Sequence, residues 1–579
     1  MRKQFLFLTV AAVVSAQGFA ADWDAAYTKA KTALGKLSQN DRLAIVSGIG
    51  WGKGPCAGNT GAATSIGFRS LCLQDGPLGV RGASSVTAFP PGVQAASTWD
   101  RALMRDRGKG IGQQSKALGV NVILGPVAGP LGKIPNGGRN WEGFGSDPYL
   151  CGVAMEQTVG GIQEGGAQAC AKHYIGNEQE KERDTVNSVI DDRTLHELYL
   201  WPFAEAVRAN VASIMCSYNK VGVKNSQVSQ GRLDDMVTRI LASWYLTKQD
   251  SGYPATAINQ NTNNGGPNVQ GNGATNAKLV AHAITTRAKK SGTTITTSTS
   301  DSTSAGASAA QNAEIAIVFI TADSGEGYIT VETNAGDRNN LEAWHSGADL
   351  VKAVAAINKN TIVVIHSVGP IILESFVDLG NVKAIVWAGL PGQESGNALV
   401  EILWGDASPS GKLPYTIAKQ QRDYGTNLQS GTDSFSEGLF IDYRYLDKNN
   451  IAPRFEFGFG LCPATGNIVP GGISSLFDIV ATVTMTLSNS GAVSGAEVAQ
   501  LYLGFPSSAP STPVRQLRGF QKTLVAGGAS TTVKFELRRK DLSYWDASGK
   551  RWVLPAGNFK VEVGASSKDL RLSGSIVVT

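Results

Sequence analysis

Four short stretches of the chain place charged or multiply hydrogen-bonding side chains beside glycine or at the end of an apolar run. They are residues 74–79 (Gln-Asp-Gly-Pro-Leu-Gly), 138–145 (Gly-Arg-Asn-Trp-Glu-Gly-Phe-Gly), 172–180 (Lys-His-Tyr-Ile-Gly-Asn-Glu-Gln-Glu) and 215–219 (Met-Cys-Ser-Tyr-Asn). Glycine lets the backbone approach a ligand closely, and every sugar hydroxyl both donates and accepts hydrogen bonds. Asp75 can accept from two hydroxyls, and donors come from Arg139, Lys172 and His173. Each residue alone is more simply an ion-pair partner, but the four stretches together favour a polar-ligand site.

Other chemistries fit the sequence poorly. The chain has only five histidines, no His pair at ligand spacing and no Cys-x-x-Cys, so metal binding is a weak interpretation. Its formal net charge is +5, or +3 without Arg2 and Lys3, which is too small for a nucleic-acid or anionic-membrane footprint. Gly-x-Gly fragments carry little weight in a chain with 68 glycines.

The elements that must position these stretches alternate between buried strands and helices. Residues 120–124 and 212–216 are apolar except for Asn121 and Ser213 and predict buried strands, and Arg193 to Ala209 has helical spacing. The alternation from residue 21 to 250 predicts an α/β domain with parallel strands, whose chemistry lies on loops after the strands. At 579 residues the chain is too long for one hydrophobic core, so we expect two to four domains.

The pattern changes twice after residue 250. Residues 251–311 are rich in Asn, Gly, Ser and Thr, which predicts a linker. Strands and helices alternate again over 312–465, which predicts an open parallel sheet covered on both faces. The expected elements are strands 315–320, 361–366 and 382–387 and helices 340–357 and 393–403. From 471 to 579 the apolar period becomes two, which predicts an antiparallel β-sandwich of fibronectin type III character.

The start of the chain has the features of a secretory signal peptide. Met-Arg-Lys precedes an apolar run from Phe5 to Ala16, and small residues follow. We therefore expect residues 1–20 to be removed and the mature protein, starting between Gln17 and Asp22, to be secreted and extracellular. The apolar run is too short to cross a bilayer, and no later stretch is long enough.

Six cysteines in an exported chain allow disulfides. Cys56 and Cys72 bracket a Gly-rich loop and are the expected pair. Cys216 ends an apolar run, where a buried free thiol and a bridge are equally compatible with the sequence.

Taken together, these motifs closely resemble fungal beta-glucosidases of glycoside hydrolase family 3. The resemblance rests on 74–79, 138–145 and 172–180 and continues through 321–328, 387–396, 433–438 and 495–502, over nearly the whole mature chain. It implies a multidomain α/β plus β architecture, with a TIM-like (β/α) barrel, an α/β sandwich and a C-terminal fibronectin type III-like β-sandwich. It also implies that the active site lies between the first two domains.

By this resemblance the reaction is retaining hydrolysis of terminal non-reducing β-D-glucosyl residues, as in cellobiose and short glucans during cellulose degradation. The substrate is a small β-glucoside or oligosaccharide; no cofactor, metal, nucleic acid or membrane is implied, and the oligomeric state stays open. The residues that match the family's glucose-gripping positions are Asp75, Arg139, Lys172, His173, Arg183 and Tyr218, with Met215 packing nearby. Glu437, in Phe-Ser-Glu-Gly, matches the general acid/base.

Retaining hydrolysis needs two carboxyl groups roughly 5 Å apart, and Glu437 supplies one. In the family the nucleophile is an Asp in a Ser/Thr-Asp-Trp motif, between the Cys-Ser-Tyr-Asn strand and an Asp-Asp-Met helix. Here only residues 220–231 separate Asn219 from Arg232-Leu-Asp-Asp-Met236, and they contain no Asp, so the nucleophile Asp is not present. Asp234 and Asp235 match carboxylates that open the following helix, and Asp184 adjoins Arg183 as an ion-pair partner.

The barrel is therefore expected to be incomplete and to expose strand edges. Two further stretches look shortened, at the Ser/Thr-rich tract and after Cys462. The chain thus lacks three internal segments whose flanking sequences are intact. A gene model in which coding sequence was treated as introns would explain this. A natural inactive paralogue is the alternative. The expected function is a beta-glucosidase of impaired activity, or else a non-catalytic secreted glucoside-binding protein. Residues 138–145 disfavour a hydrolase of β-xylosides or N-acetylglucosaminides.

Overall fold

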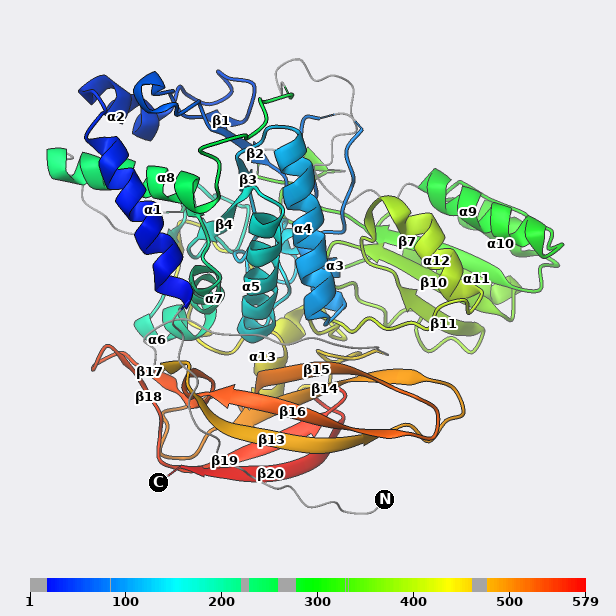
Figure 1. Ribbon diagram of the computed structural model, residues 1–579. Helices are drawn as coiled ribbons and strands as arrows, with labels where there is room; N and C mark the ends of the chain where they lie inside the picture. The colour runs from blue at the N-terminus through cyan, green and yellow to red at the C-terminus, as the bar shows by residue number, and fades with distance from the viewer. Residues whose placement is uncertain are drawn as a thin grey trace.

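The structure is a computed structural model. It describes residues 18–83, 85–219, 229–258, 277–327, 330–331, 333–460 and 476–578. Figure 1 shows three packed parts, which we call the first domain (described residues 18–258), the second domain (277–460) and the third domain (476–578). The second domain lies beside the first, and the third lies below it in that view. The predicted signal peptide falls almost entirely outside the described residues, and α1 (Gly18–Leu34) begins just inside its expected end.

A curled sheet forms the centre of the first domain. Its strand order is β1-β2-β3-β4-β6, with β1 antiparallel to β2 and the other neighbours parallel. The strands are β1 (Gly58–Asn59), β2 (Cys72–Asp75), β3 (Val122–Leu124), β4 (Gln168–Tyr174) and β6 (Ser213–Cys216). β3 is buried along its whole length, which explains why its sequence is entirely apolar. β4 is buried along nearly all of its length too, although it contains Gln168, Lys172 and His173.

Helices α4 (Arg101–Ala117) and α5 (Pro148–Glu164) cover the outer face of this sheet (Figure 1). Each begins at an aspartate whose side chain accepts from backbone N–H groups of the first turn, as N-cap residues do. The two helices cross closely because glycine lies at the contact. A Cβ on Gly112 would sit 2.2 Å from the carbonyl oxygen of Ile162, and one on Gly161 would sit 2.1 Å from that of Arg105.

The expected helix over residues 193–209 is divided into three pieces. They are α6 (Asp192–Thr194), the π-helical turn η3 (Leu195–Tyr199) and α7 (Trp201–Arg208). Pro202 lies in the first turn of α7, where its missing N–H costs no internal hydrogen bond.

The sheet stops at β6, and the prediction of an incomplete barrel is confirmed. Within the described residues no strand pairs with the outer edge of β6. The next described helix, α8 (Gln230–Leu246), instead packs against α1 and α2 (Gln39–Ser47) at the other side of the domain (Figure 1). Ile214 on β6 is 38% exposed as a result.

Cys216 corrects the sequence-based interpretation of a buried sulfur. It is an exposed free thiol, whereas Cys151 and Cys170 are buried free thiols. Its strand has alternating partial exposure, so one face of β6 is less covered than the faces of β3 and β4. An apolar run predicts burial only where a neighbouring layer covers both of its faces.

The second domain is a parallel sheet of order β11-β10-β7, as expected. The strands are β7 (Ala316–Ala322), β10 (Thr361–Ser367) and β11 (Val382–Trp387). On one face Val364 packs with helices α9 (Ala277–Lys290) and α12 (Ser395–Leu403). On the other face Val363 and Ile365 pack with α10 (Thr303–Ala310) and α11 (Gly347–Ile357).

The prediction that residues 251–311 form a linker is wrong for much of its length. Helices α9 and α10 both lie within it, and Val280 and Ile284 of α9 are buried against the sheet at helical spacing. At the start of this stretch, the Tyr253 hydroxyl donates to the carbonyl of Val120. Residues 259–276 lie outside the described residues. A few apolar side chains are enough to hold a helix against a sheet when each of them faces the core. The amino-acid composition alone does not show which way they face.

Helix α11 begins later than the expected residue 340, at Gly347. His345 and Ser346, immediately before it, both have φ of 55°, in the left-handed region that a right-handed helix cannot include.

The third domain is the expected antiparallel β-sandwich. One sheet pairs β13 (Ile479–Ser488) with β16 (Ser530–Arg538), and the other has the order β15-β14-β19-β20. The strands of the second sheet are β14 (Gly495–Gly504), β15 (Gln516–Val525), β19 (Gly557–Gly564) and β20 (Leu570–Val578). We did not anticipate β15. Both of its faces are largely buried, because Leu517 and Phe520 belong to the core of the first domain, so its sequence lacks alternation.

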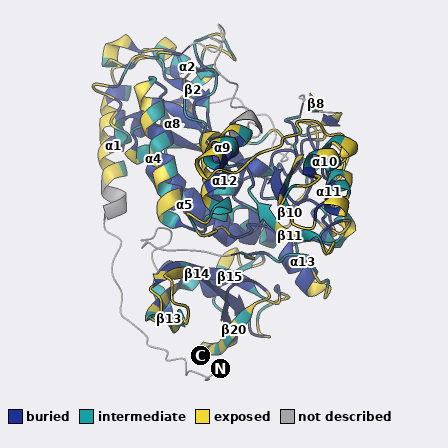
Figure 2. Cartoon of the chain, turned by 90° about the vertical axis from the view of Figure 1, so that its right-hand side faces the viewer, coloured by how far each residue is buried: buried dark blue, intermediate teal, exposed yellow. Residues whose placement is uncertain are grey.

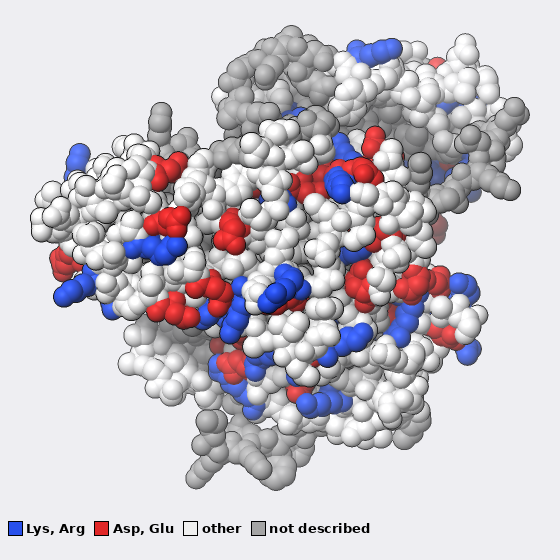
Figure 3. Space-filling view, turned by 180° about the vertical axis from the view of Figure 1, so that it is seen from behind, with Lys and Arg blue, Asp and Glu red and all other residues white. Residues whose placement is uncertain are grey.

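Burial follows this layering. In Figure 2 inner strands such as β10 and β14 are mostly buried, and exposed residues follow the outer faces of helices such as α1 and α10. No helix among the described residues is both long and apolar enough to cross a membrane. On the face shown in Figure 3, acidic and basic side chains are interspersed over the surface, in keeping with the small net charge.

Candidate functional site

The site is built around Asp75, the last residue of β2. Its two oxygens lie 3.3 Å from Nζ of Lys172, on β4, and 3.4 Å from Nη1 of Arg81. Burial alone would raise the pKa of Asp75, but the positive charges of Lys172 and Arg81 outweigh it and hold that pKa below its ordinary value. Asp75 is therefore a carboxylate at neutral pH and an acceptor only. Arg81 was not among the residues predicted from sequence.

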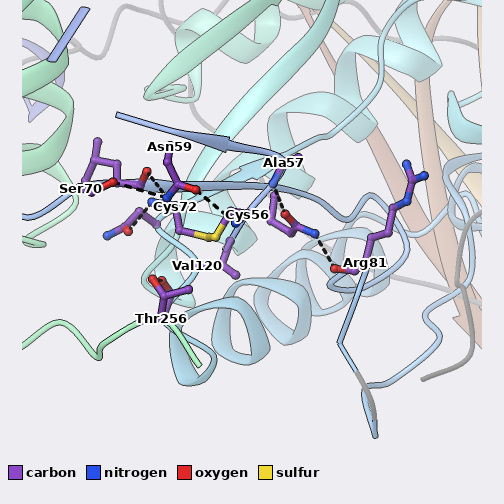
Figure 4. The surroundings of a disulfide bond; sticks show 12 residues. Cys56, Ala57, Asn59, Ser70, Cys72, Arg81, Val120 and Thr256 are labelled. Carbon is purple, nitrogen blue, oxygen red and sulfur yellow. Dashed lines mark hydrogen bonds between the residues drawn. A yellow bond between two sulfur atoms is a disulfide. The ribbon is translucent and has the colours of Figure 1, made fainter. Parts of the chain in front are cut away.

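A disulfide ties the preceding loop to the first residue of β2, three residues before Asp75, and Figure 4 shows its surroundings. Cys56 and Cys72 are bonded, and the Ala57 N–H next to the bridge donates to the side chain of Gln74 at 2.7 Å. Gln74 in turn donates to the carbonyl of Arg81 at 2.6 Å. The chain of contacts runs from the bridged loop to the arginine that holds Asp75.

His173 follows Lys172 and is buried. Its Nδ1 lies 2.9 Å from the carbonyl oxygen of Gly129, and because a carbonyl only accepts, Nδ1 carries the proton. Burial and the positive charges of Arg139 and Lys172 hold the pKa of His173 well below its usual range, so the ring is neutral. Its Nε2 is then an acceptor, so His173 does not supply the donor that the sequence suggested.

Two arginines and three carboxylates form the other side of the cluster. Arg139 makes a two-pronged contact with Glu142, at 2.5 and 2.9 Å, and Arg183 contacts Glu180 at 2.9 Å. Glu326 of the second domain lies 2.8 Å from Arg183 and 3.7 Å from Arg139. Burial opposes the charge of Arg139, but Glu142, Glu180 and Glu326 hold its pKa above the ordinary value. The second domain therefore supplies a carboxylate to a cluster otherwise made by the first.

Asp337 fixes the second domain against this cluster. Its carboxylate accepts backbone N–H groups from Gly138 at 2.7 Å, Glu180 at 3.0 Å and Lys181 at 2.7 Å. The backbones meet so closely that a Cβ on Gly138 would lie 2.5 Å from the carbonyl oxygen of Gly336. Glycine at 138 thus serves the domain contact.

Two of the predicted residues lie at the margin of the cluster. The guanidinium of Arg183 lies 4.8 Å from the ring centre of Tyr218, which is 57% exposed. Met215 packs with Val122, Leu124 and Cys170 on the inner face of the curled sheet.

Glu437 belongs to a loop that the first domain holds in place. It follows β12 (Thr432–Asp433), which pairs in parallel with β5 (Asn187–Ser188) of the first domain. Its side chain is 10% exposed, and Oε1 lies 3.1 Å from Nζ of Lys133. Lys133 also bonds both oxygens of Asp433, at 2.7 and 2.6 Å. Sequence reasoning had identified neither Lys133 nor Asp433 as a functional residue.

The other aspartates considered from sequence lie on the surface in partnerships of their own. Asp184 is exposed, and the ion pairs of Arg183 go to Glu180 and Glu326 instead. On α8, Asp234 bonds Arg42 at 2.8 Å, and Asp235 bonds Arg239 at 2.9 Å. The carboxylates inside the cluster, at Asp75, Glu142, Glu180 and Glu326, each lie within 3.7 Å of a Lys or Arg nitrogen.

A cavity of about 400 Å³ opens elsewhere in the first domain. Arg69, Asn121, Trp244, Gln249 and Tyr253 line it, at the amino-terminal ends of the strands. None of the predicted sugar-binding residues lines it.

Comparison with known families gives three matches along the chain. Residues 63–242 match the glycosyl hydrolase family 3 N-terminal domain, and residues 203–443 match the family's C-terminal domain. Residues 497–567 match a fibronectin type III-like domain.

Relatives extend over nearly the whole chain. A "Probable beta-glucosidase L" of Aspergillus terreus is 48% identical over 96% of this chain and 97% of its own length. "Beta-glucosidase cel3A" of Pyricularia oryzae is 47% identical over 96% and 97%. Among solved structures, a beta-D-glucoside glucohydrolase from Trichoderma reesei is 49% identical with a TM-score of 0.90, over 98% of this chain and 100% of that one. A beta-glucosidase from Chaetomella raphigera is 48% identical with a TM-score of 0.89, over 96% and 99%.

The lengths of these alignments bear on the missing segments. The alignment with the Aspergillus terreus relative runs over 712 positions, which exceeds the 579 residues of this chain by 133. At least 133 of those positions are therefore gaps in this chain, although both ends of the relative are nearly covered.

Proposed function

The chain belongs to glycosyl hydrolase family 3, and from this premise we propose that the cluster around Asp75 and Lys172 holds the terminal non-reducing β-D-glucosyl residue of a small β-glucoside. The observation that carries the proposal is this pair of opposite charges at the ends of neighbouring strands, beside a neutral His173. The site suits a ring of hydroxyls, because it offers a carboxylate acceptor, a neutral ring nitrogen and cationic donors side by side.

Each side chain has a role in this binding mode. Asp75 accepts from two hydroxyls, and Nε2 of His173 accepts from a third. Arg139 and Arg183 donate to ring hydroxyls while Glu142, Glu180 and Glu326 hold their guanidinium planes in place. Glu326 makes the second domain part of the sugar site. Substrates in this class are cellobiose and short β-glucans, and we propose that the enzyme acts outside the cell.

We propose that Glu437 is the general acid/base. In retaining hydrolysis one carboxyl group protonates the oxygen of the leaving group and later takes a proton from water. The other carboxyl group must attack the anomeric carbon, and the carboxylates of the described cluster are each held by a cation. The proposal is therefore that this chain carries the sugar-binding groups and the acid/base of a beta-glucosidase without its nucleophile.

The test compares the 579-residue chain with the same chain carrying a Ser/Thr-Asp-Trp segment between Asn219 and Arg232. Hydrolysis of an aryl β-glucoside by the given chain should be slower by about 1,000-fold or more, because no covalent intermediate can form. Ordinary turnover by the given chain, with its mass verified, would mean that another carboxylate attacks.

The second candidate is a glucoside-binding protein without turnover. The pairing of the cluster's carboxylates with cations favours it for the chain as given. Calorimetry should then detect glucose binding to the 579-residue chain, with xylose and N-acetylglucosamine binding more weakly. Equal binding of all three sugars would count against the glucosyl assignment.

A further inference from the structure

Lys133 is a buried cation outside the sugar-binding cluster. It lies in the loop between β3 and η2 (Asn140–Glu142), and its side chain is only 2% exposed. Its ammonium bonds both oxygens of Asp433 and lies 3.1 Å from Oε1 of Glu437. One cation of the first domain thus meets two carboxyl groups on the loop that carries Glu437.

Two more titratable groups face this set. The carboxylate of Glu178 accepts the backbone N–H groups of Leu131, Gly132 and Lys133, at 2.9 to 3.3 Å. Burial nevertheless raises the pKa of Glu178 to about 7. Burial, with the negative charges of Glu178, Glu437 and Asp433, holds the pKa of Tyr199 well above its ordinary value, so the phenol stays neutral. The positive charge of Lys133 opposes the rise in the pKa of Glu178.

The position of Lys133 is fixed at several points. Its backbone N–H donates to Glu178, and its carbonyl accepts from the Thr426 hydroxyl at 2.8 Å. Its ammonium lies 3.7 Å from the ring centre of Phe435. A lysine held in this way loses little further entropy when it contacts a carboxylate. A buried ammonium costs free energy unless it is paired, and Asp433 provides that pairing.

Glu437 is left with an unused acceptor. Its Oε1 is buried and has no hydrogen bond within the described residues, because the contact with Lys133 is not aligned for one. An ammonium has three donors, and two of them go to Asp433. The third donor is left for Oε1 of Glu437, which lies 3.1 Å from Nζ.

We propose that Lys133 is a positioning residue for Glu437. Its ammonium stabilises the ionised form of that carboxyl group, the form that takes a proton from water in the second half of retaining hydrolysis. Asp433 shares the ammonium and limits this stabilisation, which leaves Glu437 able to act as an acid in the first half. The inference rests on the proposed role of Glu437.

The test needs no turnover. N-bromoacetyl-β-D-glucosylamine places a reactive carbon where the leaving group of a glucoside would lie. The Glu437 carboxylate displaces bromide from that carbon, so that a C–O ester bond forms, the C–Br bond breaks and bromide leaves. Peptide mass mapping follows the labelling rate from about pH 4 to pH 9, which brackets the ordinary range of a carboxyl group. Only the ionised carboxyl group reacts, so the midpoint of the rate profile reports its ionisation.

In Lys133→Met the midpoint should move to higher pH, by about one to three units, because the stabilising cation is gone. Lys133→Arg should keep the midpoint near that of the parent. In Asp433→Asn the midpoint should move to lower pH, because the ammonium is no longer shared. The matched control is Lys412→Met, which removes an equally buried lysine that bonds the carbonyls of Gly460 and Ala565 elsewhere; its midpoint should not move.

The midpoints of Lys133→Met and Asp433→Asn should therefore shift in opposite directions. Damage to the fold would not produce opposite shifts in the two variants. If Lys133→Met fails to fold, Asp433→Asn decides alone, and an unmoved or raised midpoint there overturns the inference. Equal midpoints in the parent and a folded Lys133→Met also overturn it. If the parent is not labelled at Glu437 at any pH, the proposed acid/base assignment is wrong instead.

Discussion

At its boundary with the third domain, the first domain buries Glu205 of α7 among three cations. Arg208 bonds it from the same helix, and Arg538 and Lys540 contact it from the third domain, at 3.1 and 2.9 Å. The Lys540 ammonium also lies 4.0 Å from the ring centre of Trp201. At its boundary with the second domain, by contrast, the charges of Asp75 and Glu326 stay partly exposed.

The same residue types therefore serve two purposes. The Glu205 group packs against the rings of Trp201 and Phe477, and its cations are paired with the buried carboxylates of Glu205 and Asp541, so we infer that it holds two domains together. The Asp75 group keeps acceptor capacity at its exposed edge, where a ligand can replace water. Burial opposes the charge of Glu205, but Arg538, Lys540 and Arg208 hold its pKa far below the ordinary range. We expect substitutions at the first boundary to cost stability and substitutions at the second to cost binding.

The largest effect should come from Glu205→Ala. It leaves the buried Arg208 and Lys540 without their carboxylate, and breaking such a group costs about 3–5 kcal/mol. Urea unfolding followed by tryptophan fluorescence measures it, since Trp201 lies in the interface. The matched control is Glu536→Ala, at an exposed pair with Lys534, which should cost no more than about 0.5 kcal/mol. Equal losses in the two variants would remove the distinction between the boundaries.

Asp75→Asn should weaken glucose binding by about 10- to 100-fold, because a charge-assisted acceptor becomes a neutral amide. Its free energy of unfolding should change by less than about 1 kcal/mol, because the ion pairs of Asp75 are partly solvated. Calorimetry and urea unfolding on the same sample give both quantities. A stability loss as large as that of Glu205→Ala, with glucose affinity unchanged, would reverse the comparison.

The smallest effect concerns Glu156 on α5, whose pKa is raised to about 7 by burial and by the negative charge of Glu205. Because the folded pKa lies above the unfolded value of 4.5, its contribution to stability is fully present below pH 4.5 and is lost as the pH rises through 7. Glu156→Gln removes this loss. Relative to the parent, the variant should gain about 3 kcal/mol of unfolding free energy between pH 4 and pH 8.

Urea unfolding at both pH values, with Glu164→Gln on the exposed end of α5 as control, checks this prediction. A gain of the same size in the control would assign the effect to net charge rather than to the buried environment of Glu156.

The sequence predicted most strands because their apolar runs are buried on both faces, as in β3 and β10. It missed β15, because this strand is buried on both faces against the first domain and its sequence does not alternate between apolar and polar residues. It also missed α9, because only a few apolar residues hold this helix against the sheet. The residues predicted to bind sugar lie in compact motifs. Lys133 and Asp433 were missed because their contact joins positions 300 residues apart, which no local spacing reveals.

Strand β6 has no partner on its outer edge among the described residues, and this has a consequence for the production of the protein. If the chain is exported, as proposed above, Ile214 and the free thiol of Cys216 pass through an oxidising compartment while both are accessible. A strand edge without a partner among the described residues, beside an exposed thiol, allows pairing with other chains and mixed disulfides. The amount of protein that leaves the cell, more than the rate at which it works, should therefore respond most sharply to a change on this strand.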